Sequence, residues 1–198
     1  MRSIIIVTAA ILLAADPLAA EPAASSALAT APNPNLVQAK ALTQEFASTL
    51  KGELEAGIKA GGPITAIGFC KERAPDIAAK LSAQSGWKIG RVSLKWRNAK
   101  TGQPDPWEQQ VLTRFDERQA AGEPVETMAF AEVVEQNGAR HFRFMKAIPT
   151  GELCLACHGR QLAPEIAVAL DQAYPGDRAR GYSVGEVRGA FTLTKPLD

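Results

Sequence analysis

The sequence has few side chains that bind metals. Its 198 residues include three cysteines, two histidines and three methionines, one of which is the initiator. The ligands of any metal must therefore come from a short set of positions. The remaining cysteine, histidine and methionine positions are Cys70, Cys154, Cys157, His141, His158, Met128 and Met145.

The sequence also lacks an excess of charge of either sign. Lys and Arg number 22 against 21 Asp and Glu, and no basic stripe is present, which excludes a nucleic-acid partner. Hydrophobic residues make up 46% of the chain, which is typical of a soluble globular protein. The length suits one domain that is large enough to bury a proper core.

Long hydrophobic runs are absent, apart from one short run near the N-terminus. Arg2 precedes an apolar run from Ile4 to Ala15, and small residues follow, in the pattern of a signal peptide. The run of about 12 residues is too short to cross a bilayer of roughly 30 Å as a helix. We predict cleavage after Ala20 or after Ala29, the alternative being an uncleaved N-terminal anchor. The mature chain is then periplasmic or otherwise exported and has no membrane span.

Residues 21–35 are rich in Ala, Pro and Ser and hold almost no large apolar side chains. Such a segment cannot bury enough surface to fold. Residues 1–29 are therefore predicted to be a signal peptide with a disordered lead-in, and residues 30–198 the folded domain.

Helical periodicity dominates the first part of this domain. An apolar stripe predicts a helix over residues 36–59, and Gly61, Gly62 and Pro63 end it. Pro63 starts a second helix that carries Cys70. Because Pro75 disfavours helical geometry at the residue before it, we expect a break there and a short helix over residues 76–83.

Strand signals appear further along. Residues 87–98 favour a strand, Pro106 begins a helix, and Asn137-Gly138 joins two β-rich runs in a predicted hairpin. A short helix over residues 164–173 and a strand over residues 186–194 complete the chain. Because regular βαβ alternation is missing, the order predicts an α+β fold, an antiparallel sheet flanked by helices in a single domain.

The segment CLACH, residues 154–158, carries the chemistry. Haem c is attached when two thiols add to the two vinyl groups of the porphyrin, and a histidine next to the second thiol then ligates the iron. Cys154, Cys157 and His158 fit this requirement in type and spacing. Export agrees with it, because bacteria attach haem c outside the cytoplasm.

Three other interpretations of the motif stay open. A thioredoxin-like redox pair needs a βαβ context that this chain lacks. A structural zinc site needs four ligands, which Cys70 could complete as Cys₃His. A disulfide is compatible with an oxidising compartment. The odd thiol, Cys70, is either a small buried hydrophobe or a second ligand of the iron.

Several separated stretches resemble one known family. "GPITAIGFCKERAPDIA", "RVSLKWRNAKTGQPDPWEQQVLTRF", "FRFMKAIPTGELCLACHG" and "GEVRGAFTL" together look like the exported PAS-like c-type haem domains, whose best-described examples are cyanobacterial. The resemblance covers roughly residues 36–193. It implies a PAS-like antiparallel sheet and one covalent haem c, attached at Cys154 and Cys157, with His158 on one side of the iron and Cys70 on the other.

The alternatives for the sixth ligand are His141, Met128 and Met145. His141 and Met145 lie on one face of a strand that runs almost straight into the haem loop, so reaching the far side of the porphyrin would need a sharp detour. Cys70 comes from a distant helix and can approach from that side.

We expect a one-electron role, redox sensing or electron transfer, with an unidentified redox partner or signalling protein and no enzymatic activity. The alternatives are a peroxidase-like or gas-binding protein with an open distal site, and a non-haem Cys/His metal-binding module. Arg97 is the first candidate partner for a haem propionate, followed by Lys95 and Arg143. Trp87, Trp96 and Trp107 are expected to pack in the core or the haem pocket.

Overall fold

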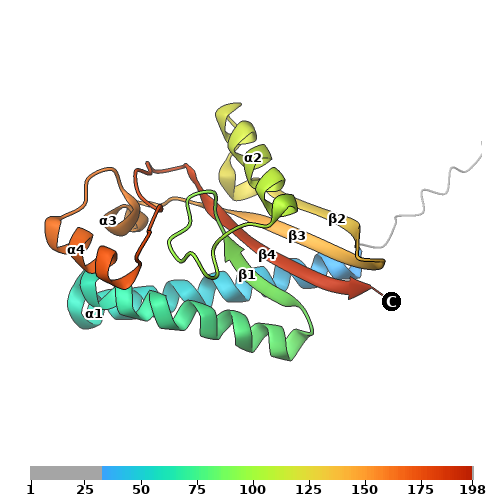
Figure 1. The fold of residues 1–198 in the computed structure, drawn as a ribbon, viewed down its shortest axis with the longest axis horizontal. Helices are drawn as coiled ribbons and strands as arrows, with labels where there is room; N and C mark the ends of the chain where they lie inside the picture. Colours follow the sequence, from blue (N-terminus) through green and yellow to red (C-terminus); the bar gives the residue numbers. More distant parts are fainter. Residues whose placement is uncertain (1–32, 198) are drawn as a thin grey trace, which may run out of the picture. The chain divides into compact units, whose positions relative to one another are not determined.

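The computed structural model describes residues 33–197, so the predicted signal peptide and lead-in lie outside the described residues. Ten elements follow one another along the chain (Figure 1). In order, these are α1 (Pro34–Ser85), β1 (Lys88–Val92), α2 (Pro106–Ala120), the 3₁₀ turn η1 (Val125–Thr127), β2 (Ala129–Gln136), β3 (Ala139–Pro149), the 3₁₀ turn η2 (Glu152–Cys154), α3 (Leu155–His158), α4 (Pro164–Ala173) and β4 (Val187–Leu197).

The four strands form one antiparallel sheet in the order β1-β4-β3-β2. The predicted hairpin is confirmed: Asn137 and Gly138 both have positive φ, 56° and 74°, as a two-residue turn between twisted strands requires. The predicted strand over residues 87–98 is real but shorter, because β1 ends at Val92. The α+β class and the PAS-like sheet flanked by helices are confirmed.

Each face of the sheet has its own hydrophobic core. Between α1 and the sheet lies a cluster that includes Phe46, Trp87, Phe144 and Leu193. On the opposite face, α2 contributes Val111, Leu112 and Phe115 to a second cluster with Met128 and Met145. This division follows from the strand period of two, because successive side chains of β3 point to opposite faces.

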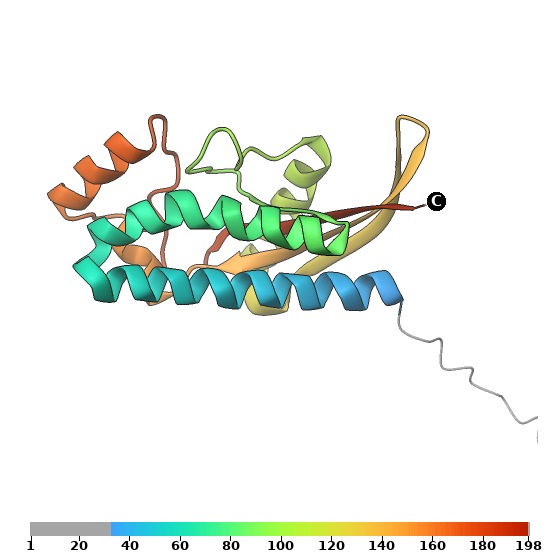
Figure 2. The same cartoon turned by 90° about the horizontal axis from the view of Figure 1, so that it is seen from below.

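The helix α1 is two antiparallel helical segments joined at Gly61 and Gly62, the only residues inside it with non-helical backbone angles (Figure 2). Gly62 has φ 76° and ψ −171°, a conformation open to glycine and unfavourable for other residues. The first helical segment thus ends at the glycine pair, as predicted, and the chain reverses there, which the sequence did not predict.

The predicted helix break at Pro75 is wrong. The helix runs through this residue, although proline removes the hydrogen bond to the Lys71 carbonyl and costs about 3 kcal/mol inside a helix. Ala74 and Leu81 on either side are 6% and 4% exposed. Burial of this helical face against the core outweighs the local preference of the residue before proline.

The sheet positions the candidate site at one end. Both η2 and α3 follow the end of β3 directly, α4 packs on the second segment of α1, and β4 ends at the opposite end of the sheet (Figures 1 and 2). Within the part of the chain that the structure describes, no helix is both long and apolar enough to cross a membrane.

A close backbone approach where β1 ends gives the first prediction. A Cβ on Gly189 would lie 2.5 Å from the carbonyl oxygen of Val92. Gly189→Ala should therefore push β1 away from β4 and destabilise the protein by about 1–3 kcal/mol, measured by urea denaturation. Gly90→Ala is the matched control on β1, since its Cβ meets only the Cγ2 of Thr192 at 3.7 Å. Equal stability of the two variants would contradict the prediction.

Candidate haem-attachment site

The CxxCH segment is fixed to the start of β4. The amide of Thr150 donates to the Glu186 carbonyl at 2.9 Å, and the amide of Gly185 donates to the Thr150 carbonyl at 2.8 Å. The segment then turns through η2 into α3, and both Cys154 and Cys157 remain half-buried free thiols. The two thiols are thus held on one short, anchored turn at the end of the sheet.

The imidazole of His158 is held in one tautomer. Its Nδ1 lies 2.7 Å from the carbonyl oxygen of Ala179. A carbonyl only accepts hydrogen bonds, so Nδ1 carries the proton and Nε2 keeps a free lone pair. Metal-ligating histidines use this arrangement, in which the second ring nitrogen donates to a backbone carbonyl. His158 is therefore oriented as a ligand through Nε2.

The charges around His158 keep it neutral. Burial, and then the positive charges of Arg188 and Arg97, hold the pKa of His158 well below its usual value. Arg188 Nε lies 3.0 Å from Nδ1 and 3.4 Å from Nε2, and only Nε2 is free to accept. Burial also lowers the pKa of Arg188, to about 10. A neutral imidazole is the form that binds a metal.

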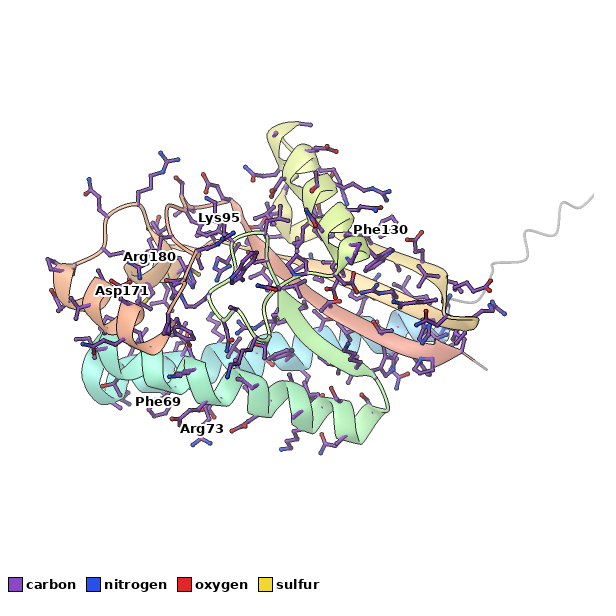
Figure 3. All side chains as sticks on the ribbon, viewed as in Figure 1. Phe69, Arg73, Lys95, Phe130, Asp171 and Arg180 are labelled. Carbon is purple, nitrogen blue, oxygen red and sulfur yellow. The ribbon has the colours of Figure 1, made fainter. Side chains whose placement is uncertain are left out.

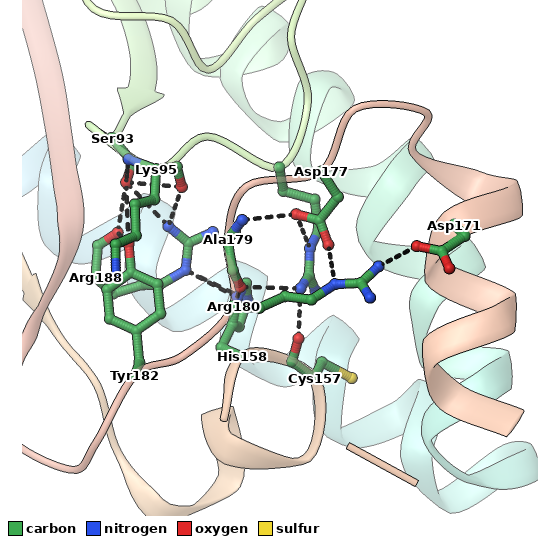
Figure 4. A network of polar contacts seen from close by, with 11 residues as sticks. Ser93, Lys95, Cys157, His158, Asp171, Asp177, Ala179, Arg180, Tyr182 and Arg188 are labelled. Carbon is green, nitrogen blue, oxygen red and sulfur yellow. Dashed lines mark hydrogen bonds and ion pairs between the residues drawn. The ribbon is translucent and has the colours of Figure 1, made fainter. Parts of the chain in front are cut away.

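A buried carboxylate organises the loop that holds His158 (Figure 4). The Oδ1 of Asp177 accepts from the Ala179 amide at 2.8 Å and from Arg97 Nε at 3.3 Å. Its Oδ2 accepts from Arg180 Nε at 3.0 Å. The side chain of Asp177 is 1% exposed, so these bonds satisfy a carboxylate that is out of contact with water.

Arg97 connects this carboxylate to the motif. Its Nη2 donates to the Cys157 carbonyl and, at 3.2 Å, to the Ala179 carbonyl that also holds His158. Arg97, the predicted propionate partner, thus lies beside the motif, with its Nε and Nη2 engaged by the protein itself. Arg97 braces the attachment loop.

The backbone adds a second brace. The amides of Tyr182 and Gly181 donate to the carbonyls of His158 and Gly159, each at 3.0 Å, in a short parallel bridge. The ring of Tyr182 stands edge-on to the imidazole with centroids 6.3 Å apart. The end of α3 is therefore held from two sides by the segment between α4 and β4.

Cys70 lies on the second segment of α1 and lines the same cavity as Cys154, Cys157 and His158. The cavity has a volume of about 1840 Å³ and extends along the sheet. Burial raises the pKa of the Cys70 thiol, while Arg91 lowers it and Cys157 raises it, so these groups lie within electrostatic reach of one another. Burial and then Cys70 raise the pKa of Tyr174 to about 12. The fold therefore brings the odd thiol to the attachment motif.

The other candidate ligands lie elsewhere. Met128 and Met145 are fully buried in the core on the α2 side of the sheet. His141 pairs with Pro196 near the far end of β3. Eight residues of strand separate His141 from Pro149, about 27 Å at 3.4 Å per residue. None of the three is placed to face His158, although the cavity reaches His141 along the sheet.

The remaining candidates from the sequence have other contacts. Arg143 forms ion pairs with Asp105 at 2.7 Å and Glu108 at 3.2 Å, beside Trp107 of α2. Lys95 Nζ lies 4.8 Å from the ring centre of Tyr182. Of the tryptophans, Trp87 is buried in the α1 core, Trp107 packs against the α2 core, and Trp96 lies beneath Arg178.

The site contains functional residues that sequence reasoning missed: Arg91, Tyr174, Asp177, Tyr182 and Arg188. Apart from Arg91, all lie between the start of the loop after α4 and the first residues of β4. The run "YPGDRARGY" is dense in charged and aromatic residues, and this density was a usable signal of a site. Its residues follow no helix or strand periodicity, so the sequence does not show which other segment they contact.

A model of the Tll0287-like family matches residues 22–196. The chain belongs to this family. The resemblance to the family with cyanobacterial examples is thereby confirmed, and the match covers all the predicted site residues.

One solved structure of a Tll0287-like protein resembles the chain with a TM-score of 0.64. It is the crystal structure of the cyanobacterial heme-protein Tll0287, 24% identical over 84% of this chain and 98% of that chain. At this identity the likeness establishes the shared fold. No curated protein sequence matches the chain.

The second prediction concerns Asp177, which binds both Arg97 and Arg180. Arg180 also binds Asp171 on α4 at 2.5 Å, where the two side chains meet (Figures 3 and 4). Asp177→Asn leaves Arg97 without its buried carboxylate and should cost about 3–5 kcal/mol of stability in denaturant titrations. Asp171→Asn removes a carboxylate that is 67% exposed from the same Arg180, and should cost less than about 1 kcal/mol. Similar losses in both variants would contradict the role of Asp177.

Proposed function

We propose that this protein is an exported monohaem c-type cytochrome that acts in electron transfer or redox sensing. In this proposal Cys154 and Cys157 attach the haem, and His158 and Cys70 ligate its iron. The observation that carries the proposal is that these four groups line one cavity, with Cys70 within electrostatic reach of Cys157 and with Nδ1 of His158 engaged by the Ala179 carbonyl. Cys70 reaches the cavity from a helix, although it lies 84 residues before Cys154 in the sequence.

The residues fit a haem better than a metal ion bound by protein alone. Among residues 33–197, no three His, Cys, Asp or Glu side chains are grouped closely enough to hold a metal ion. A haem c would need a different set of residues, two thiols to hold the porphyrin and a donor to the iron, and Cys154, Cys157 and His158 supply these. The structural likeness to a cyanobacterial heme-protein supports the same choice.

Each residue has a chemical part in this proposal. The thiols of Cys154 and Cys157 would hold the porphyrin through C–S bonds, each formed by addition of S–H across a vinyl C=C bond, which needs no external oxidant. His158 through Nε2 and Cys70 as a thiolate would ligate the iron. The haem would supply exchange of one electron, and Ala179 and Tyr182 would keep the imidazole in place.

The competing functions lack comparable support from the described geometry. A peroxidase-like or gas-binding protein needs an open distal side and an acid–base group there. The only other histidine, His141, lies far along β3. A non-haem Cys/His module needs a closed set of ligands around one ion. Both alternatives make different predictions for the experiments below.

Covalent attachment is the direct test. The full chain, produced in a bacterium that exports it and matures haem c, should be red and keep its haem through denaturing electrophoresis. Intact mass should exceed the polypeptide mass by one haem and should show an N-terminus after Ala20 or Ala29. Cys154→Ser/Cys157→Ser should carry no covalent haem, whereas Cys70→Ser should keep it. A colourless, zinc-containing wild-type protein would overturn the proposal.

Ligation by Cys70 is tested on the mature protein. Cys70→Ser should lose the thiolate signature in the ferric electron paramagnetic resonance spectrum. Its reduction potential should rise, because a thiolate favours ferric iron and axial ligands control a range of roughly 0.8 V. His141→Gln is the matched control and should leave both unchanged. A ferric spectrum that survives in Cys70→Ser would show that Cys70 is only a buried thiol.

A further inference from the structure

Positive charge exceeds negative charge around the attachment motif. Arg91, Arg97 and Arg188 all line the cavity and all act electrostatically on His158. The buried carboxylate beside them, Asp177, is already bound by Arg97 and Arg180. Half-buried arginine charges without a counter-charge carry a desolvation cost, which a bound anion would offset.

Arg91 is the first of two arginines without a carboxylate. It lies on β1, and its guanidinium carbon is 5.8 Å from the ring centre of Phe46 on α1. Its side chain lies within electrostatic reach of Cys70 and Tyr174. Among residues 33–197, it forms no ion pair with Asp or Glu within 4.0 Å.

Arg188 is the second arginine of the cavity that lacks a carboxylate partner. Its Nη1 donates to the Ser93 hydroxyl at 3.2 Å and to the Lys95 carbonyl at 3.4 Å, which are neutral acceptors. In the described part of the chain it too forms no ion pair with a carboxylate. Its Nε lies 3.0 Å from Nδ1 and 3.4 Å from Nε2 of His158, so its remaining neighbour is a neutral ring.

Two arginines without carboxylates correspond to the two propionates of a haem. Guanidinium groups bind carboxylates with paired hydrogen bonds. Arg91 and Arg188 come from β1 and β4, which are paired in the sheet, so both are anchored on one rigid support. We propose that Arg91 and Arg188, and not Arg97, bind the propionate carboxylates; this rests on the proposed haem site.

Resonance Raman spectra of the mature, haem-bearing protein test this proposal, because the propionate bending bands respond to hydrogen bonds at the carboxylates. Arg91→Gln and Arg188→Gln should each shift these bands to lower frequency, and the lysine variants should restore part of the shift. Lys88→Gln is the matched control: Lys88 lies on the same strand as Arg91 and also lines the cavity, and this variant should leave the bands unchanged.

The outcomes separate this inference from the proposed function. Bands that stay unchanged in both Arg91→Gln and Arg188→Gln, or that shift equally in Lys88→Gln, overturn the inference while covalent haem still stands. Absence of covalent haem from the wild-type protein overturns the proposed function and the inference together. If Arg188→Gln does not attach haem, the inference is tested on Arg91→Gln and Arg188→Lys instead. Bands that stay unchanged in Arg91→Gln then overturn the inference.

Discussion

The site depends on one buried ion pair, between Asp177 and Arg97. The carboxylate fixes the Ala179 amide and the guanidinium at once. The guanidinium in turn holds the carbonyls of Cys157 and Ala179, and the second of these holds His158. A chain of four groups therefore sets the position and the tautomer of the imidazole. Because each of these groups is hydrogen-bonded to the next, the arrangement is rigid. The loss of one group would therefore disturb the positions of the others.

The two hydrophobic cores provide the support on which this pair acts. One core joins α1 to the sheet and brings Cys70 towards the end of β3, while the other fixes α2 on the opposite face. A smaller apolar cluster of Ile67, Ile166, Leu170 and Tyr174 joins the Cys70 segment to α4. The polar site is thus closed on the Cys70 side by apolar packing and on the His158 side by hydrogen bonds. This division lets a charged, hydrogen-bonded site coexist with a dry core.

Sequence reasoning succeeded where the signal is local. The Asn137-Gly138 turn and the glycine pair at residues 61 and 62 each dictate a backbone conformation by themselves, and both were predicted. The CxxCH motif is local too, since its three functional residues lie within five positions. Pro75 was misjudged because burial of neighbouring residues, a tertiary effect, outweighed a local preference. Asp177 and Arg188 could not be assigned because their roles arise only when the segment after α4 returns to the end of β3.

The separation of the proposed axial donors along the chain has a mechanical consequence. His158 and Cys70 lie 88 residues apart in the sequence. An iron bound to both would therefore close a loop that contains almost half of the chain. A crosslink across a loop of that length removes unfolded-state entropy worth roughly 4–5 kcal/mol in the chain-entropy model. Release of one donor on a change of oxidation state would return that entropy to the unfolded chain. Electron uptake would then change the resistance of the whole fold to unfolding.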